Sequence, residues 1–305
     1  MPKLLLAALL LVPLATACRE AAPPPPEFNG ERAFDYLKTQ VAFGPRIPGT
    51  PAHEQEAAWL DSLLRQRADT LVVQAWPHRT AKGDTLHLTN FIARFKPGAS
   101  TRVLYLAHWD TRPHADGPNS KNKTAPVPGA DDGASGAAML VALADVLKRT
   151  PPAVGVDLLF VDGEDYGDFS ADPPTDVLIG SRYFVAHPPS GEAPAFAILW
   201  DMVGDKDLNI KKEGNSLTGA PDVVDRVWTT ARRLGYQQYF LDETGVALID
   251  DHVELQKAGI KAIDVVDFDY PYWHTPEDTI DKVSEHSLQV VGDVAAAVIR
   301  GAGAH

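Results

Sequence analysis

Cysteine is nearly absent from this chain: Cys18 is the only one among 305 residues. A single thiol cannot close an internal disulfide, so the fold must be stabilised by its hydrophobic core. The same scarcity argues against a structural zinc site, because such sites are usually closed by Cys and His ligands. Clusters of Lys and Arg are also missing, and the net charge is −13, so we expect no nucleic-acid partner.

The N-terminus carries an apolar run, residues 4–12, that is shorter than the roughly 20 residues a membrane-spanning helix needs. Lys3 precedes this run, and small residues lead from it to Cys18, which is the pattern of an export signal. Residues 1–17 are therefore predicted to be a signal peptide. The place of Cys18, directly after the expected cleavage site, resembles the lipidation site of bacterial lipoproteins. A plain secretory signal with a chance cysteine is the alternative.

A proline-rich stretch follows, with four consecutive prolines at residues 23–26. Such a run cannot form the interior of a helix, so residues 18–27 are expected to be a lipidated cysteine and a tether to the membrane. Arg19 stands where inner-membrane lipoproteins carry Asp, which by resemblance favours the outer membrane. We expect an exported, periplasmic, lipid-anchored protein whose residues 28–305 form a single domain, as a monomer.

The remaining chain alternates short apolar runs with segments of helical periodicity, and 45% of its residues are hydrophobic. This alternation predicts an α/β fold, a three-layer αβα sandwich around a mixed, mostly parallel central sheet. Strands are predicted at 71–76, 85–95, 102–107, 157–161, 195–200 and 259–266. Helices are predicted at 29–41, 178–184, 222–234 and 284–299, with two more that begin at Thr50-Pro51 and after Gly136.

Two adjacent carboxylates, Glu164 and Asp165, directly follow the predicted strand 157–161. An apolar run of this kind is typical of a strand buried on both faces, and Gly163 marks the point where it leaves the core. Open α/β sheets bind their ligands at the carboxyl ends of the strands. Two carboxylates in such a place are costly unless they share a cation or a proton.

Polar residues follow the other predicted strands in the same way. Carboxylates and imidazoles in this mixture suit zinc with one position left open for a substrate. Each residue alone has an ordinary explanation, such as a core histidine, a helix N-cap or a turn former, but their recurrence at successive strand ends favours a site. The residues are His108, Asp110, Asp131, Asp132, Glu164, Asp165, Asp201 and His274.

At these positions the chain resembles the zinc-dependent aminopeptidase clan of metallopeptidase family M28, and within it the glutaminyl cyclases of the bacterial lipoprotein type. The resemblance covers roughly residues 30 to 300. The clan motifs are His108-x-Asp110, Gly129-Ala130-x-Asp132-x-Ala134-Ser135-Gly136, Asp162-Gly163-Glu164-Asp165, Asp201-Met202 and His274-Thr275. The cyclase-like features are Phe43-Gly44-Pro45-Arg46-x-Pro48-Gly49, Ile249-Asp250-Asp251-His252 and Trp273 before His274.

The resemblance implies a role for each matched residue. Asp132, Asp165 and His274 would hold a single catalytic zinc ion, and Glu164 would be the general acid and base. Asp201 and Asp250 would form an acidic hydrogen-bond network, and Trp273 would wall the substrate pocket. The implied reaction converts the N-terminal glutamine of peptides or proteins to pyroglutamate and releases ammonia.

The sequence departs from the family pattern at two places. The zinc carboxylate after the catalytic Glu is usually a second Glu, and here it is Asp165, which leaves open whether Glu164 or Asp165 binds the metal. The animal cyclases also carry a pocket tryptophan shortly after this pair, where the present chain offers only Tyr166 or Phe169.

Two alternatives remain at this point. A two-zinc aminopeptidase would use His108, Asp132, Asp165, Asp201 and His274, a ligand set that the chain contains in full. Asp250 and Trp273 favour the cyclase, because the peptidases usually carry a small residue before Asp251-His252. A peptide-binding lipoprotein with a relic site is the non-enzymatic alternative, and it fits least well because the ligands are present.

Overall fold

The computed structural model describes residues 27–302. The predicted signal peptide, Cys18 and most of the tether lie outside the described residues. Within the described part, none of the helices combines the length and the apolar character that crossing a membrane requires.

A six-stranded sheet forms the centre of the molecule, in the order β1-β2-β4-β3-β5-β8. β1 and β2 are antiparallel to their neighbours, whereas β4, β3, β5 and β8 run parallel to one another. The sheet is therefore mixed and mostly parallel, as the sequence predicts. Its strands are β1 (Thr70–Arg79), β2 (Thr85–Phe95), β3 (Arg102–His108), β4 (Gly155–Val161), β5 (Ala197–Asp201) and β8 (Ala262–Val266).

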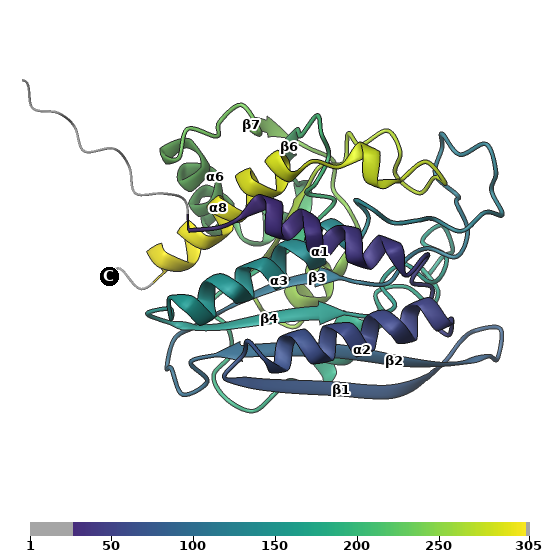
Figure 1. The fold of residues 1–305 in the computed structure, drawn as a ribbon, viewed down its shortest axis with the longest axis horizontal. Coiled ribbons are helices and arrows are strands. Elements are labelled where there is room, and N and C mark those ends of the chain that lie inside the picture. Colours follow the sequence, from purple (N-terminus) through teal and green to yellow (C-terminus); the bar gives the residue numbers. More distant parts are fainter. Residues whose placement is uncertain (1–26, 303–305) are drawn as a thin grey trace, which may run out of the picture.

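Helices cover both faces of the sheet, which gives the expected αβα sandwich (Figure 1). Alternate residues of β3 show the two faces: Val103 and Tyr105 belong to the larger core, and Leu104 and Leu106 to the smaller one. The larger core is covered by α1 (Gly30–Ala42), α2 (Pro51–Arg65), α3 (Ala134–Arg149), α6 (Pro221–Arg233) and α8 (Glu285–Gly301). The smaller core is covered by α4 (Ile179–Ala186) and α7 (Asp251–Lys257).

The helix starts follow from local chemistry. The Asn29 side chain accepts a hydrogen bond from the Arg32 amide at the start of α1, and the Thr50 side chain accepts one from His53 at the start of α2, where Pro51 is the first helical residue. These ends agree with the boundaries expected from the sequence.

A small accessory layer was not predicted. It consists of a parallel pair of short strands, together with a short helix next to β8 and a 3-10 turn. The elements are β6 (Ile210–Lys212), β7 (Phe240–Thr244), α5 (Gly214–Gly219) and η1 (Ile280–Lys282). α7 was missed as well, because its seven residues are too few to show a helical period.

Candidate active site

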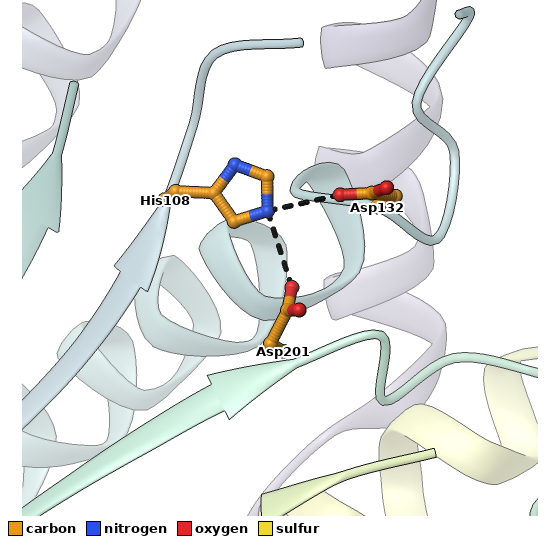
Figure 2. Close-up of side chains that lie close together, drawn as sticks. All are labelled: His108, Asp132 and Asp201. Carbon is orange, nitrogen blue, oxygen red and sulfur yellow. Dashed lines mark hydrogen bonds and ion pairs between the residues drawn. The ribbon is translucent and has the colours of Figure 1, made fainter. Parts of the chain in front are cut away.

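The carboxyl ends of β3, β4, β5 and β8 meet at one edge of the sheet, and the predicted polar residues gather there. His108 ends β3, Asp201 ends β5, and Asp132 lies on the turn that enters α3. Figure 2 shows these three side chains pointing toward one another. Parallel strands place their ends on the same side, so residues that are distant in sequence converge.

Three side chains form one potential metal cluster: Asp132, Asp165 and His274, all buried, offer ligand atoms within 4.8 Å of one another. His274 Nε2 lies 3.2 Å from Asp165 Oδ1 and 3.5 Å from Asp132 Oδ2. Asp132 Oδ2 and Asp165 Oδ2 are buried and have no hydrogen-bond partner. Buried carboxylate oxygens without a partner are costly, and a cation would satisfy them. The cluster therefore fits a zinc ion with two carboxylate ligands and one imidazole.

Glu164 and Asp165 point to different partners, which separates their roles. Both backbone amides donate to Asp110, at 3.1 and 3.3 Å. The Asp165 carboxylate turns toward His274 and also accepts from Arg112 Nη1 at 2.7 Å. Glu164 lies outside this cluster, with Oε2 3.9 Å from His108 Nδ1. The geometry thus favours Asp165 as the metal ligand and leaves Glu164 free for proton transfer.

The pKa values of the two carboxyls are shifted in opposite directions. Burial on its own would raise the pKa of Asp165, but the charges of His274 and Arg112 outweigh it and hold that pKa below its usual range. Burial, followed by the nearby charge of Asp165, raises the pKa of Glu164 well above its usual range. A pair of acids whose environments separate their pKa values is typical of a division between an ionised group and a proton carrier.

His274 is aimed at the cluster by its backbone and by Asp116. It lies in the left-handed region, with φ 53°, and its Nδ1 is 2.8 Å from Asp116 Oδ1. If Nδ1 carries the proton, Nε2 presents its lone pair to the metal. Arg112 donates hydrogen bonds to both Asp116 and Asp165, so it links the two carboxylates that contact His274. The stacking of the Trp273 ring on His274, with centroids 4.0 Å apart, further fixes the imidazole plane.

Removal of this orienting carboxylate should weaken metal binding. We expect Asp116→Ala to lower zinc affinity by about 10- to 100-fold, because the imidazole loses the partner that fixes its tautomer. Competition with a fluorescent zinc chelator measures the effect. Asp168→Ala is the matched control, since Asp168 is an exposed acid on a neighbouring loop whose carboxylate accepts hydrogen bonds from Ser170 in its own turn. Equal affinities for the two variants would contradict the role of Asp116.

A second buried acid, Asp278, supports Asp132. Its carboxylate accepts from the amides of Asp131 and Asp132, at 2.9 and 3.2 Å, and from the Tyr270 hydroxyl at 2.6 Å. Gly133, at φ 84°, completes the turn, and a Cβ there would lie 2.7 Å from the His108 ring. The turn that carries Asp132 is therefore held rigidly.

Arg46, from the motif that pointed to the cyclases, lies under the same turn. Its guanidinium donates to the carbonyl oxygens of Pro128 and Gly129, and its Nε lies 3.0 Å from Glu56 in a fully buried ion pair. Arg46 thus anchors the segment that leads into the turn with Asp132.

A second potential metal cluster contains His108, Asp132 and Asp201. His108 Nε2 lies 3.1 Å from one oxygen of each carboxylate, so Asp132 belongs to both clusters (Figure 2). Burial lowers the pKa of His108, but hydrogen bonds with Asp110, Asp132 and Asp201 outweigh it and raise that pKa well above its usual range. A protonated His108 would itself supply the positive charge between Asp132 and Asp201, whereas a neutral His108 could bind a second metal ion there.

Asp250 lies beside this second cluster. It caps α7, where its Oδ1 accepts from the Asp251 amide at 2.5 Å, and it lines the same cavity as Asp201 and Glu164. Burial and then the charge of Asp201 raise the pKa of Asp250 well above its usual range. Asp250 is therefore suited to hold a proton between neighbouring acids.

The cavity that these groups line has a volume of about 250 Å³. Its apolar wall contains Phe169 and not Tyr166, which answers the question left by the sequence; Tyr166 packs against the separate cluster of Leu86, Leu88 and Ile179. Trp273 also lines this cavity, tilted against Phe268 with centroids 5.0 Å apart. An apolar pocket with a few convergent polar groups is the usual form of a small-substrate site.

The loop that carries Asp250 is anchored by Glu213, the N-cap of α5. The buried carboxylate accepts from the amides of Asn215, Ser216 and Leu248, at 2.6–2.8 Å, and lies 3.2 Å from His252 Nε2. Burial alone would raise the pKa of Glu213, but the hydrogen bonds with His252 and Ser216 outweigh it and lower the pKa to about 2.

This lowered pKa predicts a pH-dependent stability. The unfolded value is 4.5, so the charged form of Glu213 stabilises the fold above pH 4.5, and the gain is lost as pH falls toward 2. We expect Glu213→Gln to lower the free energy of unfolding by roughly 2 kcal/mol at neutral pH. The difference from wild type should shrink between pH 4.5 and 2. Urea unfolding at several pH values measures it, and a pH-independent difference would contradict the assignment.

Several supporting residues were not predicted from the sequence: Arg112, Asp116, Glu213 and Asp278. Arg112, Asp116 and Asp278 lie in irregular loops, and nothing in the local pattern distinguishes them from solvated side chains. Glu213 could have been identified as a helix cap only if α5 had been recognised.

Comparisons with known proteins agree with this site. The model of peptidase family M28 matches residues 90–299, so the chain belongs to this family. A solved glutaminyl cyclase from Bacteroides thetaiotaomicron, bound to N-acetylhistamine, is 35% identical with a TM-score of 0.85, covering 90% of this chain and 98% of that chain. A solved leucine aminopeptidase precursor from the same organism is 36% identical with a TM-score of 0.86 over the same shares.

Other solved bacterial glutaminyl cyclases match at similar levels. Among curated proteins, Aminopeptidase YwaD of Bacillus subtilis (strain 168) is 27% identical over 252 residues, 78% of this chain and 48% of its own length. The chain spans about half the length of the first two curated relatives it matches. Both activities of the family are therefore represented among the relatives.

Proposed function

We propose that this protein is a zinc-dependent glutaminyl cyclase that converts the N-terminal glutamine of peptides or proteins to pyroglutamate and releases ammonia. The observation that carries the proposal is the place of Asp250. Its carboxyl lies in the substrate cavity beside Asp201 and Glu164, where a proton shared with Asp201 would make that residue a poor ligand for a second cation. The match to several solved bacterial glutaminyl cyclases supports it.

The reaction needs little activation of its nucleophile. The α-amine and the γ-amide of glutamine belong to one molecule, so holding the side chain folded brings the two groups into reach. The aromatic wall of Phe169, Phe268 and Trp273 would enclose the aliphatic part of that side chain and exclude water.

Asp132, Asp165 and His274 would hold one zinc ion, which supplies a Lewis acid toward the γ-carbonyl oxygen of the substrate. Glu164 takes a proton from the attacking α-amine and delivers it to the departing amide nitrogen, so that the new C–N bond forms and ammonia leaves. Asp250 and Asp201 lie next to Glu164 in the same cavity and would hold the proton near the reacting nitrogen atoms.

The second candidate is a two-zinc aminopeptidase, favoured by one specific observation: the cluster of His108, Asp132 and Asp201 is geometrically intact. The solved leucine aminopeptidase precursor supports it equally well by overall similarity. In that case Glu164 would activate a water molecule and not an amine.

Zinc stoichiometry and paired assays distinguish the two. The domain without residues 1–17 is purified, its zinc per chain is measured, and ammonia release from a Gln peptide is compared with hydrolysis of a Leu anilide. We expect one tightly bound zinc ion and ammonia release with little anilide hydrolysis. Two zinc ions with anilide hydrolysis and no ammonia would instead establish the aminopeptidase.

The cellular location is also a proposal. We infer that the protein is exported and anchored through lipidated Cys18 in the outer membrane of the cell, facing the periplasm. Support comes from the charged and apolar start of the sequence, the cysteine at the expected cleavage site and the proline-rich tether. Metabolic labelling with a fatty-acid probe in wild type and Cys18→Ala tests the lipid.

A further inference from the structure

Helix α3 connects the active site with the opposite end of the molecule. The turn that carries Asp132 leads into its first residue, and Arg149 is its last residue. The helix has 16 residues, so at 1.5 Å per residue it spans about 24 Å. At its far end the Arg149 guanidinium donates to the backbone carbonyl of Glu27 at 2.7 Å. The described chain therefore begins at the end of the molecule away from the metal cluster, beside the ends of α3 and α8 (Figure 1).

A hollow of about 460 Å³ lies at this end, lined by the first turn of α1 and the C-terminal half of α3. Three exposed cations line it: Arg32, Lys148 and Arg149. Within residues 27–302, none of the three forms an ion pair with a carboxylate. Arg32 Nε donates to the Tyr36 hydroxyl at 3.0 Å, and Lys148 donates to the carbonyl oxygen of Gln66. Neutral oxygens leave the positive charges uncompensated, so the hollow offers three cations to an anionic ligand.

The two acidic side chains of the hollow are already paired. The Glu27 carboxylate contacts the guanidinium of Arg300, with Nε 3.1 Å from Oε2. Asp145 Oδ1 accepts from Arg67 Nε at 2.7 Å, and its Oδ2 accepts from the Tyr36 hydroxyl at 2.7 Å. Positive charge thus prevails locally, although the whole chain carries a net charge of −13. An anionic surface would therefore repel most of the molecule and attract this end of it.

Helix stability explains only part of this arrangement. Cations in the last turn of a helix, such as Lys148 and Arg149 in α3, are favoured by the helix dipole. Arg32 lies in the first turn of α1, where the dipole disfavours a cation. The stability of α1 therefore does not account for its place beside the other two cations, and the positive end of α1 adds to their field. Phosphate oxygens are ligands that such groups of Arg, Lys and helix N-termini bind.

We propose that this hollow binds the phosphate of an anionic phospholipid headgroup and holds this end of the molecule against the bilayer, so that the metal cluster faces away from it. The proposal goes beyond the cyclase reaction, and it draws on the proposed anchoring only for the choice of a lipid over a soluble phosphate.

The position of the predicted tether favours the lipid. Cys18 stands nine positions before Glu27, so even a fully extended chain keeps the hollow within roughly 30 Å of an anchored cysteine. Headgroups are then the phosphates with the highest local concentration. The contact itself needs no lipid on Cys18, so it can be measured with the unlipidated protein.

The test measures binding of the domain without residues 1–17, and therefore without a lipid, to sedimented vesicles. One vesicle is pure phosphatidylcholine, and the other contains about one-third phosphatidylglycerol. We expect binding to the anionic vesicles only, and weaker binding as the salt concentration rises. The double variant Arg32→Gln, Lys148→Gln should lower the partition coefficient by about 20-fold, the scale for two cations at an anionic bilayer surface.

The matched control is Lys82→Gln, Lys121→Gln, which removes the same charge from two other exposed residues. Lys82 lies in the turn between β1 and β2, where it lines a hollow together with Arg112, and Lys121 lies in the loop that follows β3. Both are at the active-site end, so this variant should bind anionic vesicles as wild type does. Equal losses in the two double variants, or equal binding of wild type to both kinds of vesicle, would overturn the proposal.

A titration with inorganic phosphate separates the two sources of the ligand. Phosphate binding that Arg32→Gln, Lys148→Gln abolishes, without vesicle binding by wild type, would overturn the bilayer contact in favour of a soluble phosphate compound. Ammonia release from a Gln peptide is measured with the same preparations. We expect the same kcat/KM in wild type and this variant, because the hollow lies a helix length from the metal cluster. A failure of vesicle binding would therefore leave the cyclase function standing.

Discussion

Replacement of Glu164 by Gln should reduce turnover of an N-terminal Gln peptide by about 10³-fold while zinc remains bound. The amide keeps the size of the side chain but cannot accept the proton of the attacking amine. Glu164 lies outside the Asp132, Asp165 and His274 cluster, so its loss leaves the metal ligands in place. The measurement pairs kcat for ammonia release with zinc per chain.

Asp165→Asn is the informative comparison, since it changes the neighbouring carboxylate in the same way. Asp165 lies 3.2 Å from His274 Nε2 and is expected to bind zinc, so this variant should lose the metal. The opposite pattern, with zinc lost in Glu164→Gln and kept in Asp165→Asn, would mean that the two acids have exchanged roles.

The second large effect is expected at Asp250. Asp250→Asn should lower kcat for cyclisation by about 10²-fold with zinc content unchanged, because an amide cannot exchange a proton with Asp201 and Glu164. The residue keeps its cap on α7, since the amide oxygen still accepts from Asp251. Circular dichroism and thermal unfolding check that the fold is intact.

Asp250→Asn also distinguishes the cyclase from a two-zinc aminopeptidase. In a two-zinc aminopeptidase Asp250 is neither a member of the two metal clusters nor the group that activates water, so its replacement should affect anilide hydrolysis only slightly. A Gln-peptide turnover that survives Asp250→Asn would contradict the assigned role, even if the enzyme proved to be a cyclase.

The central sheet and the convergence of polar residues at its strand ends could be predicted from the sequence for one physical reason. Strands such as β3 and β4 are buried on both faces and read as continuous apolar runs, so the point at which each run meets His108 or Glu164 is visible without a structure. Because these strands are parallel, their carboxyl ends lie at the same edge of the sheet, and the polar residues that follow them come together there.

The rest of the site depends on contacts that leave no local pattern. Asp116 and Asp278 act on His274 and Asp132 from irregular loops more than 140 residues away in sequence, so only the folded chain reveals their partners. Short elements such as β6 and α5 do not span enough residues to show a period, and they were therefore missed. The sequence also could not show which of Glu164 and Asp165 faces Asp132 and His274, because that depends on the directions of the two side chains.

The most direct test of the cyclase function gives one substrate to the enzyme and weighs the products. A peptide with N-terminal glutamine is incubated with the zinc-loaded protein and followed by mass spectrometry. Cyclisation predicts a single peptide product that is lighter by one ammonia and retains every residue. Free glutamine together with a peptide shortened by one residue would contradict the account and establish an aminopeptidase.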